Sequence, residues 1–196
     1  MVSFKAPKIE EHKSFVSYKN RETTKYLVVH CSATQNVPSF TWKTIDQMHR
    51  QQGWLGIGYH FVILTDGTIQ RGRPLEAIGS HVKGYNNCSV GICLIGGVNA
   101  KGKSVDNFTE EQKESLKCLL DYLRGYYKDE VVVLGHRDFA GVNKDCPCFD
   151  VKGWYKGAKF ARYEDTEAFW SKVVFSKGVF EDFNGDPEEG DVVRIE

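Results

Sequence analysis

The sequence predicts an α/β protein of the α+β type, with a single domain in which helices flank a mixed central β-sheet. Short runs rich in β-branched and other apolar residues recur along the chain and predict buried strands. Two segments between these runs have the spacing of amphipathic helices. The dipeptide Asp66-Gly67 separates two of the runs and is typical of a hairpin turn. An antiparallel pair is therefore expected within an otherwise helix-connected sheet.

The first half of the chain predicts three strands and a helix. The first strand is expected at Tyr26–His30, and a helix follows at Thr41–Gln52. Gly53 comes directly after this helix, where a glycine commonly ends one. The hairpin joins a strand at Tyr59–Leu64 to a second one at Thr68–Arg71.

The second half predicts two further strands and a long helix. The strands are expected at Ser89–Ile95 and Val131–Leu134. Thr109 and Gln112 form the T-x-x-Q pattern of a capping box, which marks the start of a helix. Four leucines that follow share one helical face: Leu116, Leu119, Leu120 and Leu123. A further helix is expected at Asp165–Phe175.

The 196 residues are expected to divide into three parts. These are an N-terminal arm (1–24), one globular domain large enough to carry the function (25–157) and a C-terminal extension (158–196) with a candidate helix and an acidic tail. A formal net charge of zero argues against direct binding to nucleic acid or to an anionic membrane. The chain has no run of 18 apolar residues, so no membrane span is predicted. The N-terminus also lacks the apolar core of a secretory signal, and we expect synthesis and initial retention in a cytoplasm.

Three side chains have the chemistry of zinc ligands. His30 and His136 each follow an apolar run, and Cys146 lies in the loop after His136. Imidazole and thiolate both suit zinc, and three protein ligands with a fourth position left to water are typical of a catalytic site. A single histidine at the end of a strand is nevertheless more often a core residue than a ligand. The spacing alone therefore leaves the zinc site an open hypothesis.

Two other interpretations of the same residues remain open. Cys148 could add a fourth ligand, which would make a closed, structural zinc site. Alternatively, Cys146 could be the nucleophile of a Cys-His protease with His136 as its base. Cys31 is not a competing ligand, because successive side chains of a strand point to opposite faces and it follows His30 directly.

Six blocks together carry a specific resemblance. In order they are VHCSAT at 29–34, QQGWLGIGYHFVI at 51–63, GSHVKGYN at 79–86, SVGICLIGG at 89–97, GHRD at 135–138 and KDCPCFDV at 144–151. Over about residues 24–157 the chain resembles the zinc-dependent N-acetylmuramoyl-L-alanine amidases, also called the amidase-2 or peptidoglycan recognition protein family. Within that family it is most similar to the T-seven-type phage lysozymes. The resemblance implies the mixed α/β fold of the family.

The resemblance also assigns roles to individual residues. It implies one zinc ion per chain with three ligands: His30, His136 and Cys146. It implies catalytic roles for Tyr59, in the GYHF block, and for Lys144, before the cysteine. His81 lies in a glycine-rich loop, and we expect it to line the substrate groove and to bind substrate. His60 and His49 are expected to have no catalytic role.

The implied function is that of a phage endolysin. Such an enzyme hydrolyses the amide bond between N-acetylmuramic acid and L-alanine in bacterial peptidoglycan through a zinc-activated water. It would be made in the host cytoplasm and act in the periplasm after the membrane is permeabilised. The resemblance also implies a candidate second role, in which the protein binds and inhibits the phage RNA polymerase. The alternative is a non-catalytic peptidoglycan-binding protein, but family members that only bind characteristically lack the cysteine that stands here at Cys146.

Overall fold

The computed structural model describes residues 18–128, 130–155, 173–175 and 192–195. Its centre is a seven-stranded sheet in the order β5-β1-β4-β2-β3-β7-β6. The strands are β1 (Tyr26–Cys31), β2 (Phe61–Ile63), β3 (Ile69–Arg71), β4 (Ser89–Leu94), β5 (Val132–Gly135), β6 (Val173–Phe175) and β7 (Val192–Ile195). β5, β1, β4 and β2 run parallel, whereas β3, β7 and β6 follow in antiparallel pairs. The predicted mixed sheet is therefore confirmed.

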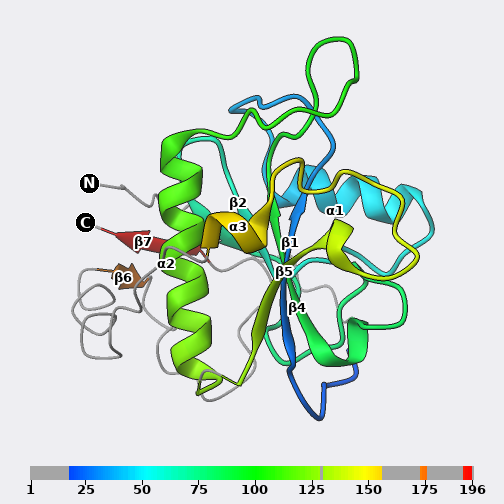
Figure 1. Cartoon of the computed structure of the whole chain (residues 1–196), viewed down its shortest axis with the longest axis vertical. Helices are drawn as coiled ribbons and strands as arrows, with labels where there is room; N and C mark the ends of the chain where they lie inside the picture. Colours follow the sequence, from blue (N-terminus) through cyan, green and yellow to red (C-terminus); the bar gives the residue numbers. More distant parts are fainter. Residues whose placement is uncertain (1–17, 129, 156–172, 176–191, 196) are drawn as a thin grey trace.

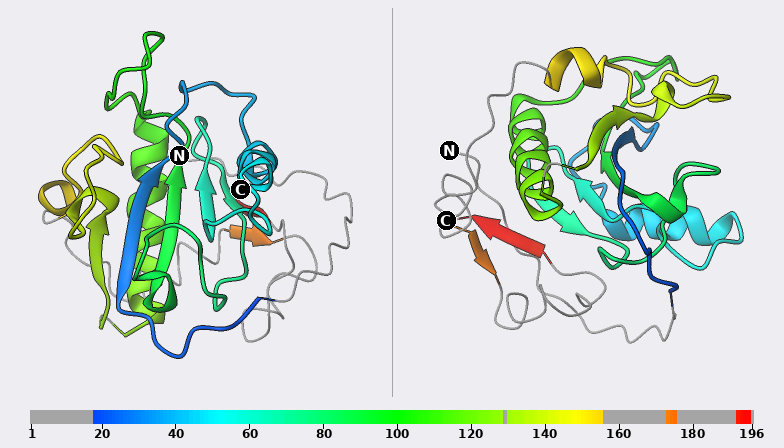
Figure 2. Two further views of the ribbon diagram at one scale, coloured as in Figure 1. Left: turned by 90° about the vertical axis from the view of Figure 1, so that its right-hand side faces the viewer. Right: turned by 60° about the horizontal axis from the view of Figure 1, so that its bottom comes forward.

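The two longer helices, α1 (Trp42–Gln51) and α2 (Glu110–Tyr126), cover opposite faces of this sheet (Figures 1 and 2). The short helix α3 (Val151–Tyr155) packs on the same side as α2, and the Tyr155 hydroxyl donates to Asp121 at 2.6 Å. Two 3₁₀ turns, η1 (Asn86–Cys88) and η2 (His136–Asp138), connect strands to loops. No helix in the part of the chain that the structure describes combines the length and apolarity needed to cross a bilayer.

Alternation along β1 decides which side chains reach the core beneath α2. Leu27 and Val29 lie in that core, whereas Val28 packs in a separate cluster on the opposite face. His30 alternates with Val29 and therefore lies on the face away from α2. The four predicted leucines of α2 are all buried in the main core: Leu116, Leu119, Leu120 and Leu123.

The capping box predicted for α2 is present. The Thr109 hydroxyl accepts the backbone N–H of Gln112, and the Gln112 side chain accepts that of Thr109, both at 3.1 Å. The amide group of Gln112 also donates to the carbonyls of Ile63 and Ile95. A buried helix terminus is thereby fixed to the ends of two neighbouring strands. Gly53 follows α1 with φ +83°, a conformation that favours glycine.

One predicted element is wrong at its end. The helix expected at residues 165–175 lies mostly outside the described residues, but its last three residues, Val173–Phe175, form the strand β6. Two β-branched residues and an aromatic residue favour an extended chain. β6 pairs with β7, which in turn extends the sheet at β3. The strand expected at Tyr59–Leu64 is shorter than predicted and begins at Phe61.

Candidate metal centre and substrate pocket

His30 and His136 are brought together by the pairing of β1 with β5. The two strands are parallel, and Val29 is the register partner of Gly135. A histidine follows each of these partners, His30 within β1 and His136 at the start of η2, so both imidazoles emerge at the same carboxyl-terminal edge of the sheet. Their ring centroids are 4.6 Å apart.

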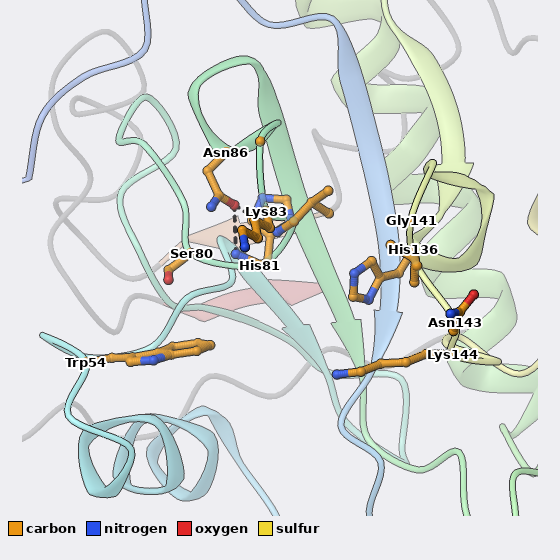
Figure 3. A pocket seen from close by; sticks show the side chains of 12 residues that line it. Trp54, Ser80, His81, Lys83, Asn86, His136, Gly141, Asn143 and Lys144 are labelled. Atoms are coloured by element: carbon orange, nitrogen blue, oxygen red, sulfur yellow. Dashed lines mark hydrogen bonds between the residues drawn. The ribbon is translucent and has the colours of Figure 1, made fainter.

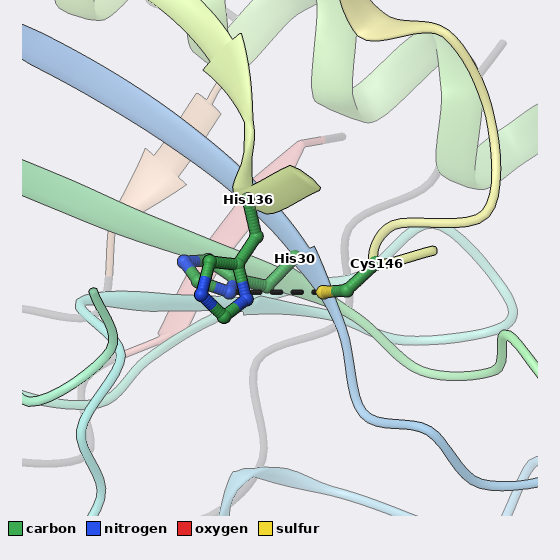
Figure 4. A group of neighbouring side chains, drawn as sticks. All are labelled: His30, His136 and Cys146. Atoms are coloured by element: carbon green, nitrogen blue, oxygen red, sulfur yellow. Dashed lines mark hydrogen bonds between the residues drawn. The ribbon is translucent and has the colours of Figure 1, made fainter. Parts of the chain in front are cut away.

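Cys146 completes this cluster from the loop that follows η2. Its carbonyl accepts the backbone N–H of Arg137 at 2.8 Å, which holds the loop against the turn that carries His136. Its sulfur lies 3.8 Å from Nδ1 of His30 (Figure 4) and accepts the backbone N–H of Cys31 at 3.3 Å. One ligand atom from each of His30, His136 and Cys146 lies within 4.8 Å of the other two.

The three donors fit a zinc ion. Zinc bonds of about 2.1 Å to nitrogen and 2.3 Å to sulfur, meeting at a tetrahedral angle, place the two ligand atoms about 3.6 Å apart. The separation of 3.8 Å between Cys146 and His30 is close to this value. Burial lowers the pKa of His30 well below its usual value. The pKa of His136 is also lowered, first by burial and second by the nearby charge of Lys144. Both imidazoles are therefore neutral near pH 7, with a lone pair to offer a metal.

The geometry argues against the two competing interpretations. The Cys148 thiol donates to the Gly97 carbonyl at 3.1 Å and lies 3.9 Å from the Cys31 sulfur, so it points away from the cluster. Among the described residues, the cluster of potential ligands contains only the two histidines and Cys146. The sulfur of Cys146 contacts His30 rather than forming the hydrogen-bonded pair with His136 that a Cys-His protease needs.

A pocket of about 430 Å³ adjoins the cluster and shares His136 with it. Figure 3 shows Trp54 on one side and Lys144 on the other, each directed toward the space between them. Residues 80–84 and Asn86 form the remaining wall, together with residues 141–143. Its volume is that of a ligand-binding site.

Both predicted catalytic residues lie beside the cluster, Tyr59 next to His30 and Lys144 next to His136. The Tyr59 ring lies 5.0 Å from that of His30 between centroids, and burial raises the pKa of its hydroxyl well above 10, so the phenol is neutral. Lys144 is exposed on the pocket wall next to His136. The structure thus brings Tyr59, Lys144 and the three potential ligands to one end of the sheet.

His81 also lies on the pocket wall, but both of its ring nitrogens are engaged within the protein. Nδ1 lies 3.0 Å from Nε2 of His30, and Nε2 lies 3.3 Å from the Ser89 hydroxyl. Burial lowers the pKa of His81 to about 3, so the ring is neutral. Its predicted contact with substrate stays a prediction, and such a contact would involve ring carbons or the backbone.

Sequence reasoning missed Trp54 as a pocket residue. Trp54 is 39% exposed, and its ring packs at a tilt against that of His49, with 4.5 Å between the centroids. His49 in turn accepts the backbone N–H of Gly58 and packs 5.3 Å from the ring of Tyr59. The sequence did contain a signal for this role, because Trp54 lies between Gly53 and Gly56 in a segment predicted to be a loop, where a large aromatic residue is available to bind a ligand. His60 is structural as predicted, since its Nδ1 accepts the backbone N–H of Gly91.

A mixed sheet with a His/His/Cys cluster beside a pocket is an arrangement suited to a single-metal hydrolase. Comparison with known proteins specifies the family. The profile of the N-acetylmuramoyl-L-alanine amidase family matches residues 20–149. The endolysins of Klebsiella phage KP32 and Escherichia phage T7 are each 46% identical over 141 residues, which cover 72% of this chain and 91% of each relative.

Solved structures agree with this match. The endolysin N-acetylmuramoyl-L-alanine amidase LysCS from Clostridium intestinale is 31% identical, with a TM-score of 0.55 over 80% of this chain and 93% of that one. A mutant of Drosophila PGRP-LB in complex with tracheal cytotoxin is 26% identical, with a TM-score of 0.60 over 74% of this chain and 87% of that one. The chain belongs to the N-acetylmuramoyl-L-alanine amidase family and is an amidase of the phage endolysin type.

Proposed function

We propose that this amidase uses one zinc ion, held by His30, His136 and Cys146, to hydrolyse the bond between N-acetylmuramic acid and L-alanine in peptidoglycan. The observation that carries the proposal is the convergence of three zinc-type donors within 4.8 Å at one edge of the sheet. When bound, zinc lowers the pKa of a coordinated water toward about 7 and polarises a carbonyl oxygen. The neutral imidazoles leave the thiolate of Cys146 as the only anionic ligand of the three.

We propose that Lys144 stabilises the charge that develops during the reaction. As the amide carbon becomes tetrahedral, negative charge collects on its oxygen. The Lys144 side chain points into the pocket beside His136 and can place its ammonium group near that oxygen (Figure 3). A single well-placed donor of this kind contributes about 3–4 kcal/mol to the transition state.

Tyr59 is assigned to the attacking water. Desolvation of the half-buried ring raises the pKa of the Tyr59 hydroxyl, so the hydroxyl keeps its proton near neutral pH. A neutral phenol can accept a hydrogen bond from water and donate one in turn, which allows it to orient the water or to pass a proton. Its ring packs between His30 and His49, and this packing limits the positions that the hydroxyl can take.

The test is digestion of purified peptidoglycan by the zinc-loaded protein with analysis of the products. Hydrolysis of the proposed bond releases new L-alanine amino groups without new reducing sugar ends. The matched control is Cys146→Ala, which is expected to release neither. A wild-type protein that binds peptidoglycan without releasing amino groups would instead support the non-catalytic alternative.

The boundaries and the biological setting are also proposals. We assign catalysis to residues 25–157, and the family match over residues 20–149 supports this assignment. We propose that the enzyme reaches its substrate from the host cytoplasm only after a separate membrane lesion. Cells that express it alone should stay intact until the inner membrane is permeabilised, and prompt lysis without such damage would contradict this route. Inhibition of phage RNA polymerase stays a prediction, to be tested by transcription in the presence of the purified protein.

A further inference from the structure

A chain of hydrogen bonds leads from His30 away from the cluster. Nε2 of His30 lies 3.0 Å from Nδ1 of His81, and Nε2 of His81 lies 3.3 Å from the Ser89 hydroxyl. The Ser89 hydroxyl is 2.7 Å from the carbonyl oxygen of Tyr85 and donates to it. Ser89 is fully buried, so water does not compete for this contact.

The carbonyl at the end of this chain determines where each proton lies. A carbonyl oxygen only accepts, so the single hydroxyl proton of Ser89 is committed to Tyr85. The Ser89 oxygen can therefore only accept from His81, which places the proton of His81 on Nε2. Nδ1 of His81 is then an acceptor, and Nε2 of His30 must donate to it.

This arrangement also determines the protonation of Nδ1, the other ring nitrogen of His30. A neutral imidazole carries one proton, and on His30 that proton is on Nε2. Nδ1 is thus left with its lone pair, and Nδ1 is the nitrogen that lies 3.8 Å from the Cys146 sulfur (Figure 4). The tautomer that the hydrogen bonds select is the one that can ligate a metal within the cluster.

The His81 ring is held firmly in place. A Cβ atom added at Gly91 would lie 2.7 Å from Cγ of His81, and one added at Gly79 would lie 2.5 Å from its Cδ2. Only glycine at these two positions leaves space for the ring. The Asn86 side chain accepts the backbone N–H groups of His81 and Val82, each at 2.8 Å, and so fixes the loop itself (Figure 3).

We infer that His81 is a positioning residue for the metal ligand His30, and that Ser89 and the Tyr85 carbonyl set the tautomer of both rings. This inference rests on the proposed zinc site. It assigns His81 a role through His30 rather than through contact with substrate, in accordance with the engagement of both ring nitrogens. Partners of this kind orient metal-ligating histidines and raise their basicity.

The test compares the zinc affinities of His81→Ala and His81→Asn by competition with a chromophoric chelator. We expect His81→Ala to weaken zinc binding by roughly 10- to 100-fold, the usual effect of losing such a partner. The side-chain amide introduced by His81→Asn would keep an acceptor near the former Nδ1 position, so this variant should recover most of the affinity. The control is His49→Ala, which removes a buried histidine whose Nδ1 accepts the backbone N–H of Gly58 and not a hydrogen bond from a proposed ligand.

Proton positions in the wild-type protein provide a second measurement that needs no variant. In ¹⁵N-histidine spectra of the metal-free protein, His30 and His81 should each carry their proton on Nε2. Protonation of either ring on Nδ1 would overturn the inference, as would zinc affinity in His81→Ala within about threefold of wild type, well short of the expected range. If the wild-type protein binds no zinc at all, it is the proposed function that fails instead.

Discussion

The sulfur of Cys146 lies 3.8 Å from Nδ1 of His30, although 116 residues separate them along the chain. Backbone contacts hold both residues in place. β1 is fixed by its pairing with β4 and β5, and the loop that carries Cys146 is held by its hydrogen bond to Arg137. None of the three proposed ligands belongs to the hydrophobic core beneath α2. We therefore expect the fold to persist without the ion, unlike metal domains that fold only when the ion binds.

The first prediction concerns Cys146. Cys146→Ala should bind no zinc and lose amidase activity while keeping its secondary structure, because Cys146 is not one of the residues that form the core beneath α2. Metal analysis and circular dichroism check both parts. Cys118→Ala is the control, since Cys118 lies on α2 and should leave zinc binding intact. Retention of one zinc per chain in Cys146→Ala would remove this cysteine from the ligand set. Unfolding of the wild-type protein on chelation would indicate a structural metal.

The second prediction concerns Lys144. Lys144→Ala should keep its zinc and its affinity for peptidoglycan, while kcat falls on the order of a hundredfold or more, the usual effect of removing one oxyanion donor. Lys83→Ala is a matched control, because Lys83 is also exposed and lines the same pocket. Equal losses in both variants would indicate a general attraction of the substrate to positive charge. A Lys144→Ala enzyme with nearly wild-type turnover would exclude the proposed role.

The third prediction separates the Tyr59 hydroxyl from its ring. Tyr59→Phe keeps the ring that packs against His30 and His49, so zinc content and thermal stability should change little. Loss of the hydroxyl should lower kcat on the order of a hundredfold, as expected for a group that assists proton transfer. Steady-state kinetics with soluble peptidoglycan fragments measures the effect. Unchanged kcat would limit Tyr59 to a packing role.

Sequence patterns predicted those parts of the fold that depend on local periodicity. The leucines of α2 and the capping box at Thr109 follow from spacing within one segment. The strand-end positions of His30 and His136 could also be predicted, because an apolar run precedes each histidine. Their adjacency could not, since it depends on the Val29–Gly135 register between distant strands.

Contacts between side chains of different segments were beyond sequence reasoning. The hydrogen bond between His81 and His30 joins a glycine-rich loop to β1, and no spacing rule relates the two. The error at Val173–Phe175 has a similar origin. A run of three residues carries little periodicity, and its pairing with β7, many residues later, decides its conformation.

The last prediction concerns stability in acid. Burial lowers the pKa of His49 from 6.5 to about 4. Inside the protein its Nδ1 accepts the backbone N–H of Gly58. Between these two values the unfolded chain binds the proton more readily than the folded chain. Stability therefore falls as the pH drops from 6.5 toward 4, and the contribution of His49 is constant above this range.

His49→Asn keeps an acceptor for Gly58 but removes the titrating group. The slope of the unfolding free energy against pH should decrease by up to about 1.4 kcal/mol per pH unit in this window, the value for one proton. Urea unfolding of the metal-free proteins between about pH 4 and pH 8 measures both slopes. Buried His60 and His81 also have lowered pKa values, so the variant should still lose stability in acid, but less steeply. Parallel curves for the two proteins would show that His49 titrates alike in the folded and unfolded chains.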